Sequence, residues 1–263
     1  MRTTTTMSAW VERLQSLGRY TFTRAQAEAD TGRSFVAAQT ALRRLKEQGR
    51  VVAPRRGFYV VVPPEYRAAG APPATWFIDD LMRHLGQAYY VGLLSAAAIH
   101  GAAHQQPMVF QVVTSKPTRR LRVGRSAIQF LMSNRLEQLP AKETNTETGT
   151  MRVATPETTA FDLVRFPSNA GGLSNVATVL SELAERLDGK ALVALAPVVR
   201  VPDVQRLGFL LDAVGRAKVA APLARWIAGR NPRTVALHPG RPAGVADDEK
   251  WRVRPNVVLE PDV

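Results

Sequence analysis

The chain has 263 residues, of which 45% are hydrophobic and 22% charged, a composition typical of a folded globular protein and unlike that of a disordered one. It contains no cysteine, which excludes disulfides, thiolate nucleophiles and cysteine-ligated metal sites. Lys and Arg number 35 against 22 Asp and Glu, so the formal net charge is +13. A surplus of this size favours polyanionic partners, either nucleic acid or an anionic membrane surface.

The first residues are polar, and the apolar region of a signal peptide does not follow them. No uninterrupted stretch approaches the roughly 18 apolar residues that a membrane-spanning helix needs. We therefore expect a cytoplasmic protein that makes no membrane contact.

Helical patterns open the chain. Apolar residues at helical spacing predict a first helix over 8–17, which Gly18 ends. Thr23 can cap a second, short helix over 24–30, and a third helix is expected over 34–48. The order predicts three helices packed together.

The third helix has two different faces. Phe35, Ala38, Leu42 and Leu45 share one face and are expected to pack on the first two helices. The opposite face carries small residues and cations and is shaped to enter a groove; it holds Val36, Ala37, Thr40, Arg43 and Arg44.

Two short β-rich runs, 50–53 and 58–62, follow and are separated by a turn that contains Gly57. A hairpin directly behind three helices is the wing of a winged helix-turn-helix. Pro63 and Pro64 end it, and 68–73, rich in Ala, Gly and Pro, indicates a linker. We therefore expect a DNA-binding domain over 1–67 and a second domain over 75–263.

The second region alternates between helix and strand before it becomes mainly helical. Thr155 and Pro156 predict a helix start. The expected helices are 76–85 (capped by Thr75), 93–100, 160–165, 173–187, 204–214 and 222–227, and the expected extended segments are 108–114, 121–123, 128–132, 150–154, 234–237 and 251–259. The predicted fold class is α+β, with an N-terminal winged helix-turn-helix followed by a larger mixed α/β domain.

Positive charge is concentrated in the predicted winged helix. Residues 1–67 contain 12 Lys and Arg against 5 Asp and Glu, which contributes +7 of the total +13. Cations along a groove-sized helix and an adjoining wing gain affinity for DNA through counterion release. Candidate base contacts are Ser34, Thr40, Arg43 and Arg44, and candidate phosphate contacts are Arg24, Arg33, Lys46, Arg50, Arg55 and Arg56. The alternatives are a solvated helix face or a protein-binding winged helix.

A second basic run lies between and within the expected strands. It includes Lys116, Arg119, Arg120, Arg122 and Arg125, extends to Arg135, and contains no acidic residue up to that point. It suits an auxiliary contact to DNA or RNA, or else a solvated sheet edge whose charges oppose aggregation.

No catalytic motif stands out. His100 and His104 have the spacing of metal ligands on a helix, but Gly101 interrupts them and a polar packing role fits better. Glu157 and Asp162 could form a carboxylate pair, and 247–250 (Asp-Asp-Glu-Lys) could form a nuclease site, although such acids are more often solvated. We expect no catalytic residue, no metal site and no cofactor.

Several segments together resemble the AbiE-type abortive-infection antitoxins of type IV toxin-antitoxin systems, which include AbiEi-like transcriptional regulators. The resemblance covers nearly the whole chain. The runs 90–101 and 155–163, in that order, are more specific to this family than the wing segment 55–60. The segments are 55–60 (RRGFYV) with Pro63 and Pro64, 90–101 (YVGLLSAAAIHG), 155–163 (TPETTAFDL) and 206–211 (RLGFLL).

The resemblance implies an N-terminal winged helix that represses its own operon by binding inverted repeats. It implies a C-terminal domain that counteracts a nucleotidyltransferase-like toxin without forming a stable complex. Carried over, it places DNA recognition on Thr40, Arg43 and Arg44, with Arg55 and Arg56 in the wing. It assigns no role to residues of the C-terminal domain.

Two other functions remain open from the residues. A metal-dependent nuclease would require the acids of 247–250 to converge in a cleft. A ligand-sensing repressor would require a sizeable apolar pocket within 75–263.

Overall fold

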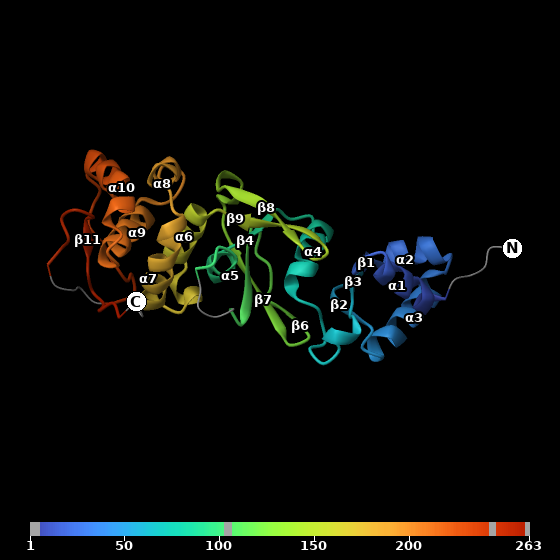
Figure 1. The fold of residues 1–263 in the computed structure, drawn as a ribbon. Helices are drawn as coiled ribbons and strands as arrows, with labels where there is room; N and C mark the ends of the chain where they lie inside the picture. Colours follow the sequence, from blue (N-terminus) through green and yellow to red (C-terminus); the bar gives the residue numbers. More distant parts are fainter. Residues whose placement is uncertain (1–5, 103–106, 242–245, 261–263) are drawn as a thin grey trace.

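The computed structural model describes residues 6–102, 107–241 and 246–260. Figure 1 shows three parts in a row: a small unit of helices and strands at the N-terminal end, a larger sheet in the middle, and a group of helices at the C-terminal end. One buried apolar cluster lies within the N-terminal unit, and a second runs continuously through the middle sheet and the C-terminal helices. The α+β class predicted from the sequence is confirmed.

The N-terminal unit has the order of a winged helix-turn-helix. Thr23 accepts a hydrogen bond from the backbone N–H of Gln26 at the start of the second helix, and Ser34 accepts one from Ala37 at the start of the third. The elements are α1 (Met7–Ser16), α2 (Arg24–Thr31), α3 (Phe35–Glu47), β2 (Val51–Arg55) and β3 (Phe58–Val61). The three helices and the hairpin predicted from the sequence are therefore present.

A third strand, β1 (Thr21–Thr23), pairs antiparallel with β3 and makes the sheet order β1-β3-β2. The sequence did not predict it, because three residues are too few to show an alternating pattern. Its pairing partner also lies far along the chain.

The expectation that Phe35 packs in the core is wrong: Phe35 is 47% exposed, whereas Ala38, Leu42 and Leu45 are buried. Phe35 is the first residue of α3 and lies at the edge of its apolar face. The guanidinium of Arg24 stacks on its ring at 4.3 Å.

Strand β3 is shared between the two apolar clusters. Val61 belongs to the cluster of the N-terminal unit and Tyr59 packs against it, whereas Phe58 and Val60 belong to the large cluster. This follows from the alternation of side chains along a strand. One face of the sheet therefore covers α1–α3, and the other faces α4 (Ile78–His84), where the ring of His84 lies 5.3 Å from that of Phe58.

Residues 63–77 connect the parts through two short 3-10 helices, Pro64–Tyr66 and Ala74–Trp76. The expected cap at Thr75 is wrong, since α4 begins after Phe77 without a side-chain cap. The segment predicted as a linker is held against the sheet: Arg125 donates its backbone N–H to the oxygen of Ala69 at 2.8 Å. A Cβ at Gly124 would lie 2.2 Å from that oxygen, so the approach needs a glycine.

The middle sheet has six strands in the order β6-β7-β5-β4-β9-β8. Two neighbouring pairs, β5 with β7 and β4 with β9, are parallel, and the other pairs are antiparallel. The strands are β4 (Tyr89–Val91), β5 (Val109–Thr114), β6 (Leu121–Val123), β7 (Ser126–Met132), β8 (Ala141–Thr146) and β9 (Gly149–Ala154), and helix α5 (Leu93–Ile99) follows β4. Strands β4 and β8 were not predicted; the others were.

The C-terminal part is mainly helical, as predicted, and α8 is an addition to the prediction. Thr155 caps α6 through the backbone N–H of Thr158, with Pro156 in the first turn. The elements are α6 (Pro156–Arg165), α7 (Leu173–Leu183), α8 (Gly189–Leu195), α9 (Val201–Ala213), α10 (Ala217–Arg230), β10 (Val235–Ala236) and β11 (Val253–Arg254), with 3-10 turns at Leu136–Gln138, Pro167–Ala170 and Ala184–Arg186.

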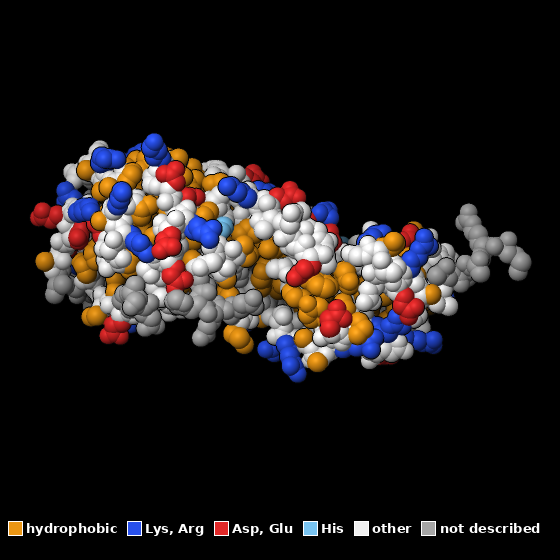
Figure 2. Space-filling model, viewed as in Figure 1, with side chains coloured by type: hydrophobic (Ala, Val, Ile, Leu, Met, Phe, Trp, Pro, Cys, Tyr) orange, Lys and Arg blue, Asp and Glu red, His pale blue; other side chains and the backbone are white. Residues whose placement is uncertain are grey.

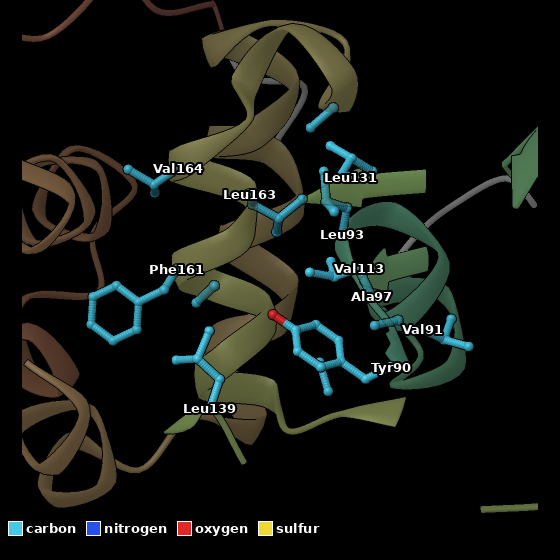
Figure 3. Packing of buried hydrophobic residues seen from close by; sticks show 14 of the residues in the cluster. Tyr90, Val91, Leu93, Ala97, Val113, Leu131, Leu139, Phe161, Leu163 and Val164 are labelled. Atoms are coloured by element: carbon cyan, nitrogen blue, oxygen red, sulfur yellow. The ribbon is translucent and has the colours of Figure 1, made fainter. Parts of the chain in front are cut away.

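Helix α6 joins the sheet to the C-terminal helices. Its residues 157–164 are all buried. Figure 3 shows Leu163 directed toward Leu93 and Leu131 on the sheet side, whereas Phe161 and Val164 point the opposite way. Because both sides of α6 are covered, the middle and C-terminal parts share one core.

The C-terminal segment is held on α9 by Trp251. A Cβ added at Gly208 would lie 2.0 Å from the ring of Trp251, and the indole Nε1 donates to Asp212 Oδ2 at 2.8 Å. The glycine in the 206–211 segment is thus required by packing. Within the described ranges, no helix combines the length and apolar character needed to cross a membrane.

Candidate nucleic-acid interface

The outward side of α3 carries cations that are open to solvent. Arg43 and Arg44 are exposed, and Thr40 lies half-buried between them and the start of the helix. Arg43 makes an ion pair with Glu47 at 3.8 Å in which both side chains remain largely exposed, an arrangement that holds the arginine weakly. Ser34 is used as the helix cap, so its hydroxyl is already engaged with the backbone.

A hollow of about 390 Å³ separates the start of α3 from the hairpin. Arg55, Arg56 and Gly57 line it from the turn between β2 and β3, while Phe35 and Gln39 line it from α3. Gly57 adopts a φ of 78° that allows the turn. Helix and wing thus flank a concave, cationic surface.

Arg24 lines the same hollow but is already paired. Its Nε lies 3.1 Å from Glu28 Oε1, and its guanidinium stacks on Phe35. It therefore supplies less uncompensated charge than Arg56, which is exposed.

The structure separates Arg50 from the other predicted phosphate contacts. Its Nη2 lies 2.8 Å from Glu12 Oε1, and it also donates to the hydroxyl of Ser8, so it joins the start of β2 to α1. Lys46 is exposed in the last turn of α3, and Arg33 is half-buried in the turn before it.

The wing tip is tied to the middle part of the molecule. Arg55 Nη2 donates to the backbone oxygen of Arg119 at 2.8 Å, and His84 Nε2 lies 3.2 Å from the backbone oxygen of Arg56. Thr21 of β1 donates to Asp80 of α4. These contacts set the position of the wing relative to the sheet. Local sequence patterns could not have revealed the bond between Arg55 and Arg119, because the two residues are 64 positions apart in the chain.

The second basic run lies beside the wing, because Arg119 contacts Arg55. None of its members in 116–125 forms an ion pair with another residue in the described ranges, and all are exposed: Lys116, Arg119, Arg120, Arg122 and Arg125. Figure 2 shows Lys and Arg side chains along the lower edge of the molecule, under α3 and again near β6. Arg135 differs, since it donates to the backbone oxygen of Val198.

The two acids considered as a pair, Glu157 and Asp162, are used separately. Glu157 accepts the backbone N–H of Asp188 at 3.0 Å. Asp162 is fully buried and accepts the hydroxyl of Tyr90 at 3.3 Å; its other oxygen has no hydrogen-bond partner among the described residues. Burial raises the pKa of Asp162 to about 7. His100 contacts the backbone oxygen of Ala154 at 2.8 Å, and His104 lies outside the described residues.

The acids of 247–250 do not converge. Asp247 pairs with Arg254 at 2.6 Å, Asp248 accepts the backbone N–H of Trp251, and Lys250 pairs with Asp212. Among the described residues, no group of three or more His, Asp and Glu side chains is placed to hold a metal ion.

A hollow of about 530 Å³ lies beside α5. Apolar Ile99 and Phe110 line it together with polar Ser95 and Glu147. Met108, also in its wall, is 92% exposed, so this part of the wall faces solvent. The lining mixes apolar and polar residues, and the hollow remains the place for the pocket that a ligand-sensing repressor would need.

Comparison with known proteins relates two parts of the chain to one family. Residues 11–62 match the family model "Transcriptional regulator, AbiEi antitoxin", and residues 90–213 match "AbiEi antitoxin C-terminal domain". The crystal structure of the RV2827C protein from Mycobacterium tuberculosis is similar, with a TM-score of 0.64 and 18% identity over 94% of this chain and 89% of that chain. At that identity the likeness shows the fold alone. No curated protein matches the sequence.

Proposed function

Because the chain belongs to the AbiEi antitoxin family of antitoxins and transcriptional regulators, we propose that it represses its own operon and counteracts a nucleotidyltransferase-like toxin in the cytoplasm. In this proposal the N-terminal winged helix, domain 1–67, binds duplex DNA at inverted repeats. The C-terminal domain, 75–263, serves the antitoxin activity and forms no stable complex with the toxin. No cofactor takes part.

The observation that carries the DNA-binding part is the outward side of α3. Arg43 and Arg44 are open to solvent on the helix whose first turns line a hollow, and the far wall of that hollow bears Arg55 and Arg56. A helix with this shape and charge can lie in the major groove, while the turn of the hairpin meets the neighbouring backbone.

Each predicted contact has a proposed role. Arg43 and Arg44, with Thr40 beside them, contact base edges. Arg33, Lys46 and Arg56 contact phosphates. Arg24 and Arg55 contribute from the walls of the hollow, whereas Arg50 stabilises the unit by its bond to Glu12, and Ser34 caps the helix.

The second basic run extends the phosphate-binding surface. Arg119 lies against the wing tip, so duplex DNA that follows the hairpin would next meet Arg120 and Arg122. The bond from Arg55 to Arg119 holds this part of the sheet close to the wing, which supports the auxiliary role over that of an isolated solvated edge.

A titration tests the DNA-binding part. The duplex upstream of the protein's own gene should bind more tightly than a scrambled duplex of equal length. Its affinity should fall about a thousandfold between about 50 and 200 mM salt if some six phosphates are contacted. Equal affinity for both duplexes, or no dependence on salt, would contradict the proposal.

Co-expression tests the antitoxin part. The nucleotidyltransferase-like reading frame adjacent to this gene should arrest growth when expressed alone. Growth should recover with the full-length chain, and the two proteins should elute separately in size-exclusion chromatography. Persistent arrest would contradict antitoxin activity without affecting the DNA-binding result.

A further inference from the structure

We infer that the first two turns of α3 read A·T base pairs in the major groove, with Val36 on the thymine methyl group and Gln39 on the adenine edge. This inference rests on the proposed DNA binding and adds the chemistry of the bases that are recognised. Neither residue stands among the contacts predicted from the sequence.

Val36 is placed on the stripe of α3 that points away from the core. It is 69% exposed, and Thr40 and Arg43 follow it at intervals of four and three residues, so all three share that side. An exposed valine alone carries no information, because single apolar residues are common on protein surfaces. Its position is informative, since a recognition helix contacts base edges with its N-terminal residues.

Phe35, the neighbouring exposed apolar residue, is arranged differently. Its ring is covered by the guanidinium of Arg24 and lines the hollow toward the wing. It therefore forms a wall, and Val36 is left as the apolar group at the front of the helix.

Gln39 lies three residues after Val36, so the two side chains are neighbours on the helix surface. It is exposed, lines the hollow, and its amide makes no hydrogen bond with any residue in the described part of the chain. A glutamine amide offers one acceptor and two donors, which matches N6 and N7 of adenine in bidentate fashion.

The distribution of charge along α3 points to the same bases. Residues 35–42 contain no cation and no carboxylate, whereas Arg43, Arg44 and Lys46 all lie in the second half. The first half thus lacks the arginine that pairs with guanine and the acid that accepts from cytosine. What it offers is a methyl-bearing side chain and an amide, and an A·T pair presents the complement of both in one groove.

The test begins with binding-site selection from a pool of random duplexes by the wild-type chain. The selected duplexes are then titrated by fluorescence anisotropy with each thymine replaced in turn by uracil, which lacks the methyl group, and each adenine by 7-deazaadenine, which lacks N7. For the wild type, uracil at the contacted position should weaken binding roughly fourfold, the value of burying one methyl-sized group. Deazaadenine should weaken it at least fivefold.

The variants assign each effect to its residue. Val36→Ala should bind the thymine and uracil duplexes equally, and Gln39→Ala should bind the adenine and deazaadenine duplexes equally. Leu17→Ala, another exposed apolar residue (63%), and Gln138→Ala, an exposed glutamine of the middle part, should keep the wild-type discrimination.

The outcomes separate this inference from the proposed function. Salt-dependent binding by the wild type with no response to uracil or deazaadenine at any position would overturn the reading of A·T pairs and leave DNA binding intact. Discrimination retained in Val36→Ala and Gln39→Ala would overturn the assignment to these residues. Failure to bind any duplex at low salt would overturn both the inference and the proposed function.

Discussion

The arginines on α3 and two arginines of the C-terminal helices are used in different ways. On α3, Arg44 forms no ion pair or side-chain hydrogen bond within the described ranges, and Arg43 has one exposed partner. In the C-terminal helices, Arg200 binds Asp203 through two nitrogens, and Arg216 donates to the backbone oxygen of Ser181. Net charge alone therefore overstates the cations that are available to a polyanion, because arginines such as Arg200 and Arg216 are already engaged, whereas Arg44 on α3 and Arg225 in the C-terminal helices are exposed.

The largest expected effect is on DNA affinity. Replacing Arg43 and Arg44 together with alanine should weaken binding to the preferred duplex by about 1 to 3 kcal/mol for each bidentate arginine–base pair that is removed, and it should relax base preference. Urea unfolding should be unchanged, because both side chains are exposed. Arg225→Ala, an exposed arginine of the C-terminal helices, is the control and should bind normally. Unchanged affinity of the double variant would remove these arginines from the interface.

The buried carboxyl group of Asp162, in the core shared by the middle and C-terminal parts, should make the free energy of unfolding depend on pH. Burial raises the pKa of Asp162 to about 7, while the unfolded value is about 4, and Tyr90, Arg165 and Asp203 are the ionisable groups that act on it. The folded protein thus holds this proton longer than the unfolded chain. The contribution of Asp162 to stability is greatest below about pH 4, falls as the pH rises to about 7, and stays low above that.

Asp162→Asn should abolish this fall. It keeps the acceptor for Tyr90 without ionising, so it should be more stable than the wild type at pH 8 by up to about 4 kcal/mol, with a small difference at pH 4. Urea unfolding at several pH values measures this difference. Glu137→Gln, at an exposed carboxylate, is the control. Parallel pH profiles for the wild type and Asp162→Asn would show that the carboxylate is solvated.

For Arg206 we expect a loss of stability without a change in DNA affinity, the reverse of what we expect for Arg43 and Arg44. Its Nε donates to the backbone oxygen of Ala236 at 3.1 Å, and its Nη1 lies 3.8 Å from the buried Asp203. Arg206→Ala should lower the free energy of unfolding by about 2 kcal/mol, the contribution of a hydrogen bond from a charged donor, while Asp203 keeps its two bonds from Arg200. DNA affinity should not change. Loss of affinity in a variant that remains folded would break the contrast between the two groups of arginines.

The smallest effects are expected beside the wing. Arg56→Ala and Arg120→Ala should each reduce the slope of log affinity against log salt by about 0.9 and weaken all duplexes alike. Titrations at four salt concentrations measure this slope. A change confined to one duplex sequence would instead indicate base contacts.

The order of the N-terminal elements could be predicted from the sequence because its signals are local. The cap at Thr23, the apolar face of α3 and the glycine turn of the hairpin all act within a few residues. Strand β8 could not be recognised, since its sequence AKETNT is that of a polar edge strand whose pairing with β9 defines it. Strand β4 was missed because its three residues are all buried and show no alternation.

The roles of single cations were harder to predict than the fold. Arg50 has the same local surroundings as a phosphate contact, but its partner Glu12 lies 38 residues earlier. The bond from Arg55 to Arg119 is likewise invisible in local patterns, although two basic runs in one chain could have suggested a common surface. Periodicity places Val36 on the outward face of α3, but Gln39 could be recognised only from its exposure and its place in the hollow beside the wing.

The strand shared by two cores has a consequence for any shortened version of the protein. A fragment that ended after the hairpin would present Phe58 and Val60 to water and would tend to self-associate, so DNA affinity measured on it would report on aggregates. In the intact chain β3 packs on both apolar clusters and so joins the N-terminal unit to the middle sheet. If two copies bind an inverted repeat as proposed, this joint would hold their C-terminal helices in one orientation relative to the DNA.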